Sequence, residues 1–321
     1  MFSLKLRMFL LTAVLFAVVY AIVSMVSYKL GISNFYFYLG LSFAIMLIQY
    51  MLGPKIVEWT MRVKYIKESE NPRLHQMVRV LATTAGIPVP RIGIADIAIP
   101  NAFAFGRSIK DGRICVTSGI MSLLNDEEMR AVLGHEMSHI KNRDVLTMTL
   151  LSVIPMILYR IAWQFLFYGN RRDRNSSSGG TAMIGLAAFL FYFITNLLVL
   201  YASRIREYFA DKGSIDLGNR PAAMASALYK LVYGSARMPK DAIKNVEGMK
   251  AFFANDPSRA TSDFKDLSRL DLDRSGTISP DELAQLTGKN VKLGFGDKVF
   301  ELMSTHPNML KRIKRLSEWG R

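Results

Sequence analysis

Residues 135–139 read His-Glu-Met-Ser-His, which places two histidines four positions apart with a glutamate between them. Residues four apart on an α-helix share a face, so both imidazoles can bind one tetrahedral zinc ion. Glu136 would then face the water that the metal activates, which is the arrangement of a zinc-dependent peptide hydrolase. A pattern this short also occurs by chance, but the chain has only four histidines and the motif contains two of them.

The residues before this motif indicate a helix. Asn125 or Asp126 can cap its start, and the two glutamates that follow suit the positive end of a helix dipole. Three apolar residues recur at helical spacing, namely Met129, Val132 and Leu133. The sequence therefore predicts that His135 and His139 lie on one helical face.

A catalytic zinc usually has three protein ligands and leaves one position for water. Glu207 is the best candidate for the third ligand, because it lies in a polar stretch, 203–211, directly after a long apolar segment. Asp211 follows four residues later on the same helical face, where it could hydrogen-bond a ligand histidine. The alternative is that the charged residues of 203–211 form a solvated helix end beside a membrane.

Four segments of the chain resemble the membrane-bound HtpX-type zinc endopeptidases, which are related to the CAAX prenyl endopeptidases. In order they are 101–106 (NAFAFG), 135–144 (HEMSHIKNRD), 203–211 (SRIREYFAD) and 304–307 (STHP), with Arg312 and Ile313 following the last. The resemblance covers nearly the whole length. The family usually has a second proline after the His-Pro pair, where this chain has Asn308.

The resemblance implies roles for residues outside the 135–139 motif. Glu207 becomes the third zinc ligand, and Asp211 and Asp144 are expected to support the ligands by hydrogen bonds. His306 and Arg312 become candidates for stabilising the tetrahedral oxyanion. The expected cofactor is one zinc ion per subunit.

The chain between the first apolar segments and the motif is expected to contain an amphipathic helix over 71–85 and strands over 91–96 and 112–118. Segment 101–106 should lie on a strand beside the motif helix, with an edge that could pair with an extended peptide. The candidate substrate-binding residues are Asn101, Ala102, Phe103 and Ala104. The alternative is a merely structural hairpin.

Half of the residues are hydrophobic and the mean hydropathy is +0.18, so the chain is too apolar for a typical soluble enzyme and too charged to lie wholly in lipid. Four segments are long enough to consider as membrane spans, namely 8–28, 34–52, 145–169 and 181–202. Lysines and arginines flank the first pair on both sides, so the positive-inside rule places both flanks in the cytoplasm.

The second pair of apolar segments allows two readings. Pro155 and Arg160 interrupt the third segment, and the loop after it carries three arginines. These segments either span as a hairpin or lie partly in the membrane interface. His139 and Glu207 must reach one metal, so the chain between them crosses the membrane an even number of times or not at all.

Other features of the composition narrow the functional classes. Cys115 is the single cysteine, which excludes an intramolecular disulfide and fits a buried strand residue. The formal net charge of +15 is spread along the chain without a nucleic-acid-binding motif, so we expect attraction to anionic lipids and no nucleic-acid partner.

Residues 271–282 (DLDRSGTISPDE) match the twelve-residue EF-hand loop, with glycine at position six and glutamate at position twelve. The candidate calcium ligands are Asp271, Asp273, Ser275, Thr277, Ser279 and Glu282. EF-hands normally come in pairs, and no second loop is found in the sequence. The alternative is an acidic turn that binds nothing at cellular calcium concentrations.

The predicted fold is mainly α with a small β-sheet, in a membrane-anchored zincin-type metalloprotease with transmembrane helical hairpins. Its parts are an N-terminal hairpin (1–54), the catalytic domain in two pieces (55–144 and 203–321) and a second apolar hairpin (145–202). The resemblance implies a multi-pass protein of the cell membrane whose catalytic domain faces the cytoplasm. There it would cleave misfolded or damaged membrane proteins, in protein quality control and the stress response. The alternatives are a non-enzymatic membrane adaptor with structural zinc and calcium, and a CAAX-type prenyl-protein endopeptidase.

Overall fold

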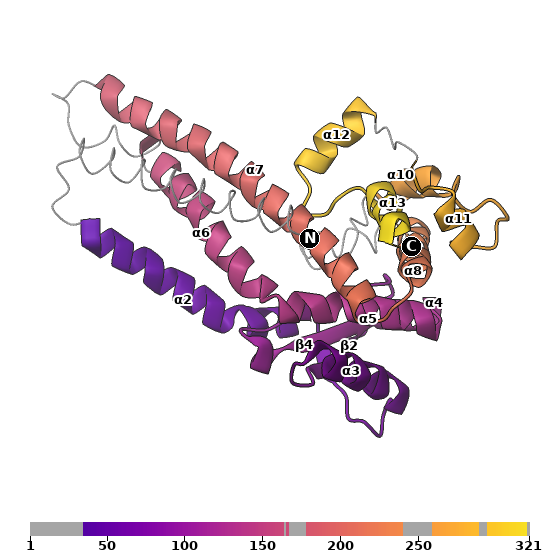
Figure 1. Ribbon diagram of the computed structural model, residues 1–321. Coiled ribbons are helices and arrows are strands. Elements are labelled where there is room, and N and C mark those ends of the chain that lie inside the picture. Colours follow the sequence, from indigo (N-terminus) through magenta and orange to yellow (C-terminus); the bar gives the residue numbers. More distant parts are fainter. Residues whose placement is uncertain (1–34, 164, 167–177, 240–258, 289–293, 320–321) are drawn as a thin grey trace. The chain divides into compact units, whose positions relative to one another are not determined.

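The computed structural model describes residues 35–163, 165–166, 178–239, 259–288 and 294–319, which are mainly helical with one small mixed sheet (Figure 1). The chain divides into two compact units, one formed by 1–51 and 146–203 and the other by 52–145 and 204–321. Three helices contain a boundary between the units: α2 (Phe35–Thr60), α6 (Asp144–Trp163) and α7 (Ser178–Asp216). The expected first apolar segment, 8–28, lies outside the described residues, as does most of the loop between α6 and α7.

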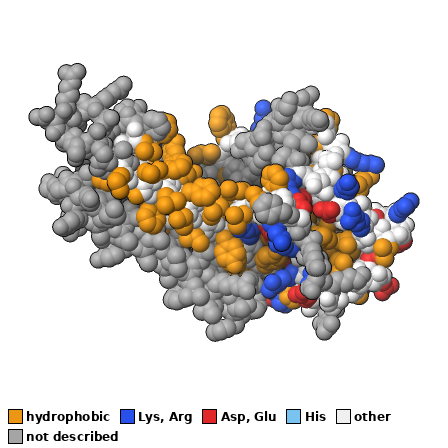
Figure 2. Space-filling model, turned by 90° about the horizontal axis from the view of Figure 1, so that it is seen from above, with side chains coloured by type: hydrophobic (Ala, Val, Ile, Leu, Met, Phe, Trp, Pro, Cys, Tyr) orange, Lys and Arg blue, Asp and Glu red, His pale blue; other side chains and the backbone are white. Residues whose placement is uncertain are grey.

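The described residues of the first unit include both buried and exposed apolar side chains. Its core is formed by side chains of α6 and α7, namely Leu151, Ile154, Leu158, Val199 and Ala202. Other large apolar side chains of α7 are exposed, and Figure 2 shows hydrophobic side chains gathered among the described residues of the face in view. Among the described residues, the helix over 183–216 is the one long and apolar enough to cross a membrane.

The second unit contains a four-stranded sheet formed by β1 (Val63–Tyr65), β2 (Arg91–Ala95), β3 (Ala102–Phe105) and β4 (Arg113–Thr117). The strand order is β1-β2-β4-β3, so β3 is an edge strand. β2 and β4 are parallel, whereas β3 runs antiparallel to β4 with Ala104 opposite Ile114. The strands predicted over 91–96, 101–106 and 112–118 are thus confirmed, and Cys115 is buried in the sheet as expected.

Helices α3 (Pro72–Ala85) and α5 (Asp126–Lys141) contribute to a hydrophobic core that also includes residues of the sheet. α5 contains the 135–139 motif, as predicted. It begins with a capping box, in which the Asn125 side chain accepts a hydrogen bond from the Glu128 backbone and the Glu128 carboxylate accepts one from the Asn125 backbone. The predicted apolar stripe of this helix is buried in the core.

A second core holds the C-terminal part of the chain together. It is surrounded by α8 (Pro221–Ala236), α10 (Ala260–Leu267), α11 (Pro280–Ala284) and α13 (Met309–Trp319). The remaining short elements of this unit are the 3-10 turn η1 (Ile109–Asp111), α4 (Ser118–Leu123) and α12 (Phe295–Leu302).

Candidate metal centre

The C-terminal end of α7 packs against α5 at unusually close range. A Cβ atom added at Gly213 would lie 2.1 Å from the Ser138 Oγ, and one at Gly134 would lie 2.3 Å from the Asn219 Nδ2. The Ser214 hydroxyl also donates a 2.6 Å hydrogen bond to the Ala131 carbonyl. This close approach places the end of α7 against the motif helix.

Replacing Gly213 by alanine should therefore push the two helices apart. We expect Gly213→Ala to reduce the free energy of unfolding by about 1–3 kcal/mol, as overpacked cores do, and to weaken zinc binding. Thermal denaturation and zinc analysis measure the two effects. Adding Ser138→Gly should restore part of the loss by removing the clashing side chain. Gly53→Ala is the control, because a Cβ there meets nothing within 4 Å; equal effects at both glycines would contradict the prediction.

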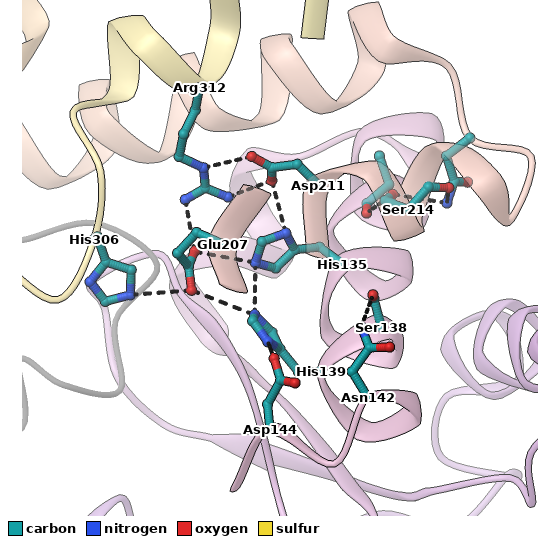
Figure 3. Close-up of polar contacts among 12 residues, drawn as sticks. His135, Ser138, His139, Asn142, Asp144, Glu207, Asp211, Ser214, His306 and Arg312 are labelled. Carbon is teal, nitrogen blue, oxygen red and sulfur yellow. Dashed lines mark hydrogen bonds and ion pairs between the residues drawn. The ribbon is translucent and has the colours of Figure 1, made fainter. Parts of the chain in front are cut away.

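His135, His139 and Glu207 converge on one point (Figure 3). The two Nε2 atoms lie 3.1 Å apart, and the Glu207 carboxylate oxygens lie 3.5 Å from that of His135 and 3.6 Å from that of His139. Tetrahedral zinc with bonds of 2.0–2.1 Å holds its ligand atoms about 3.4 Å apart. The spacing of these three side chains therefore fits a zinc ion.

Each histidine of this cluster also contacts a carboxylate through its other ring nitrogen. The Nδ1 atom of His135 lies 2.9 Å from Asp211, and that of His139 lies 2.5 Å from Asp144. Such contacts fix the ring orientation and keep Nε2 available for a metal. The structure thus brings Asp211 and Asp144 to the places expected from the sequence.

Two buried arginines pair with these carboxylates, which the sequence did not lead us to expect. Arg312 is fully buried; it donates 2.6 and 2.9 Å hydrogen bonds to Asp211 and lies 3.1 Å from Glu207. Arg206 forms an ion pair with Asp144. The resemblance implied an oxyanion role for Arg312, and Arg206 lies in the stretch 203–211 whose alternative reading was a solvated helix end. Only the three-dimensional contacts reveal that both arginines support the cluster.

Glu136 and His306 lie beside the three candidate ligands. Glu136 is buried, and the backbone of Ala104, on the edge strand β3, lies near enough to lower its pKa slightly against the effect of burial. His306 lies in the segment between α12 and α13, with its Nε2 3.9 Å from Glu207 and its Nδ1 2.9 Å from the Thr305 hydroxyl. The cluster therefore has a carboxylate and a third imidazole within reach of a bound substrate.

The cluster has unequal protonation in the absence of metal. Burial by itself would lower the pKa of His135, but the neighbouring carboxylates of Asp211 and Glu207 outweigh it and raise the pKa to about 9. Burial and the neighbouring His135 lower the pKa of His139 to about 4. Burial likewise raises the pKa of Glu136 and lowers that of His306.

Zinc binding should therefore release a proton. At pH 7 the metal-free His135 lies below its pKa and is protonated, and it must lose that proton to bind zinc, so about one proton should be released per zinc. Calorimetric titration in two buffers of different ionisation enthalpy measures this number. The number of protons released per zinc should fall toward zero above pH 9. If no proton is released at pH 7, His135 is not protonated in the metal-free protein.

The EF-hand-like loop, 271–282, belongs to another segment of the chain than this cluster. It follows α10 and includes the first residues of α11. Carboxylate oxygens of Asp271, Asp273 and Glu282 lie within 4.8 Å of one another. Of the other predicted calcium ligands, Ser275 and Thr277 hydrogen-bond each other through their hydroxyls, and Ser279 caps α11. Gly276, at position six, has φ +80°, a conformation that favours glycine.

Comparison with known proteins identifies the family of this chain. The model of peptidase family M48 matches residues 68–320, which include every residue of the cluster. The chain belongs to this family. The HtpX-type resemblance expected from the four sequence segments is thereby confirmed.

Several relatives of this M48 peptidase carry the name Protease HtpX homolog. The relative from Methanothermobacter thermautotrophicus is 54% identical over 230 residues, which is 72% of this chain and 86% of the relative. The relative from Thermococcus sibiricus is 33% identical over 327 residues, which is 97% of this chain and 96% of the relative. The M48 chain also resembles the crystal structure of S. mikatae Ste24p, with a TM-score of 0.48 and 17% identity over 98% of this chain and 67% of that one.

Proposed function

We propose that this protein is a membrane-bound, zinc-dependent endopeptidase that cleaves misfolded or damaged membrane proteins on the cytoplasmic side, in protein quality control. The observation that carries the proposal is the spacing of the His135, His139 and Glu207 ligand atoms, which suits tetrahedral zinc, with Glu136 buried beside them. Membership of the M48 peptidases and relatives named as proteases support it. The proposed roles of the individual residues follow from the same geometry.

The chain supplies the groups that peptide hydrolysis needs. Zinc bound at this site would polarise the scissile carbonyl and lower the pKa of a water molecule. Glu136 accepts the proton of the attacking water and passes it to the leaving amine. His306 stabilises the negative charge that develops on the carbonyl oxygen. Because Arg312 is fully buried against Asp211 and Glu207, we assign it the positioning of these two carboxylates in place of the oxyanion role expected from the sequence.

The edge strand β3 offers a place for the substrate backbone. Segment 101–104 enters this strand, and the backbone of Ala104 lies near Glu136, so an extended peptide paired with β3 would lie beside the catalytic carboxylate. Backbone pairing holds many sequences in one register, which suits a protease with damaged proteins as substrates. Asn101, Ala102, Phe103 and Ala104 thus remain the proposed substrate-binding residues.

Digestion of casein by the full-length protein in detergent tests the proposed activity. Cleavage should stop when zinc is removed by a chelator and return when zinc is restored. A protein that binds zinc stoichiometrically but never cleaves would instead support the membrane adaptor. Selective cleavage of prenylated peptides, with casein intact, would support the CAAX-type endopeptidase.

We also propose that the apolar helices anchor the protein as transmembrane hairpins with both parts of the catalytic domain in the cytoplasm. The exposed apolar side chains of α7 and the basic residues after residue 52 support this arrangement. Reporter fusions after Lys67 and at the C-terminus should both report a cytoplasmic location. An extracytoplasmic signal at either point would overturn the topology.

Calcium binding at 271–282 is a further part of the proposal. The convergence of Asp271, Asp273 and Glu282 supports it, and Ile278, which pairs with a second loop in ordinary EF-hands, is buried in the C-terminal core instead. We expect a dissociation constant of about 10⁻⁵ to 10⁻³ M, because the loop has three carboxylates and no partner loop. Calorimetry should show binding that Glu282→Gln weakens. No heat at millimolar calcium would reduce the loop to a structural turn.

A further inference from the structure

Helix α12 exposes apolar side chains on one face. Val299 and Leu302, and Met303 directly after the helix, are 45%, 48% and 50% exposed. Positions 299, 302 and 303 lie three or four residues apart and therefore share a side of the helix. A surface helix of a water-soluble domain normally turns such a face toward the core.

The opposite face of α12 is held to the protein by charged groups. Asp297 accepts a 3.0 Å hydrogen bond from Arg259, and Glu301 forms an ion pair with Lys311 of α13. Glu301 also accepts a hydrogen bond from the backbone of Asn308. The helix is thus inverted relative to ordinary amphipathic helices, because its acidic side faces the protein and its apolar side faces outward.

The end of α12 is tied to the place on α7 where the apolar stretch stops. Arg204 donates hydrogen bonds of 3.0 Å to the Leu302 carbonyl and 2.7 Å to the Ser304 carbonyl. Arg204 comes two residues after Ala202, the last residue of apolar segment 181–202, which is about 3 Å along the helix. A membrane span that ends at Ala202 therefore places residues 302–304 at the membrane surface.

We propose that α12 inserts its apolar face into the surface of the lipid bilayer that anchors the protein. The inference rests on the proposed membrane anchoring. Both the level of residues 302–304 and the outward apolar face suit a lipid interface, and the exposed Lys298 suits anionic headgroups. His306 follows two residues after Ser304, so contact with lipid also positions the segment that carries this imidazole.

Spin labels on α12 test the insertion. Cys115→Ala removes the single native thiol, and Val299→Cys or Leu302→Cys then accepts a nitroxide in full-length protein reconstituted into phosphatidylcholine and phosphatidylglycerol vesicles. Two exposed leucines serve as references: Leu190 of α7, 57% exposed, and Leu272 of the 271–282 loop, 60% exposed. Zinc content confirms that each labelled protein has folded.

For each label, the rate of collision with oxygen is divided by the rate of collision with a water-soluble nickel chelate. This ratio should be several-fold higher for the labels at 299 and 302 than for the label at 272. If the nickel chelate reaches the labels at 299 and 302 while the Leu190 label is shielded in lipid, the proposed insertion of α12 is wrong, but the proposed membrane anchoring still holds. Shielding of both labels from oxygen and nickel alike would also overturn it, because another part of the protein would cover the helix. A nickel-accessible Leu190 label would overturn the anchoring, and the insertion with it.

Discussion

Glu136→Gln should abolish most of the proteolytic activity while the protein keeps its zinc. The amide has the shape of the carboxylate and fits the same buried position, but it cannot accept a proton from the attacking water. Loss of a general base typically costs about 10²- to 10⁴-fold in rate. Zinc should remain, because the three convergent ligand atoms belong to His135, His139 and Glu207. Casein cleavage and metal analysis of the same preparation measure both outcomes.

The matched control for this variant lies on the same helix. Glu127→Gln makes the same chemical change at an exposed position in the first turn of α5. It should leave both cleavage and zinc content close to those of the unchanged protein. A Glu136→Gln protein as active as this control would show that another group accepts the proton.

Local signals in the sequence were sufficient for the motif helix. The cap at Asn125, the apolar spacing after it and the four-residue separation of His135 and His139 all act within one helix, and the structure has this helix as predicted. Glu207 and Asp211 could be proposed in the same way, because their spacing indicates one helical face. Chemistry that depends on a single helix could thus be predicted from the sequence.

Contacts between distant segments could not be predicted in this way. Arg312 and Asp211 are separated by 101 positions, and nothing in the sequence near either indicates that they pair. The pairing of Arg206 with Asp144 likewise depends on how α7 lies against the start of α6. A solvated helix end was the alternative reading for Arg206, because an arginine is rarely buried without a partner.

The sheet shows the same division between local and distant information. Strands β2, β3 and β4 have apolar residues and turn signals that predict them, whereas β1 is three residues long and partly exposed, so it has too little alternation to be recognised. Strand order depends on pairing across the chain, which a single sequence does not reveal. Segment 101–106 was expected to form a strand beside the motif helix with an edge that could pair with a peptide. The position of β3 at the end of the strand order is known only from the structure.

Glu207→Ala should remove zinc from the site, whereas Asp211→Asn should only weaken its binding. Glu207 provides one of the three ligand atoms, and two histidines alone leave the metal with too few protein ligands. Asp211 contacts His135 from the side away from the metal position, so its loss should reduce zinc affinity by about 10- to 100-fold. Competition with a chromogenic chelator measures these affinities directly.

The relative size of the two losses in zinc affinity distinguishes a ligand from a residue that orients a ligand. Asp216→Ala is the matched control, since Asp216 is an exposed carboxylate on the same helix that pairs only with Lys212 among the contacts described. It should bind zinc normally, and the melting temperatures of all three metal-free variants show whether the fold persists. Stoichiometric zinc of unchanged affinity in a folded Glu207→Ala protein would exclude Glu207 from the ligands. An Asp211→Asn protein that loses zinc as completely as Glu207→Ala would mean that the metal depends on the orientation of His135 as much as on the third ligand.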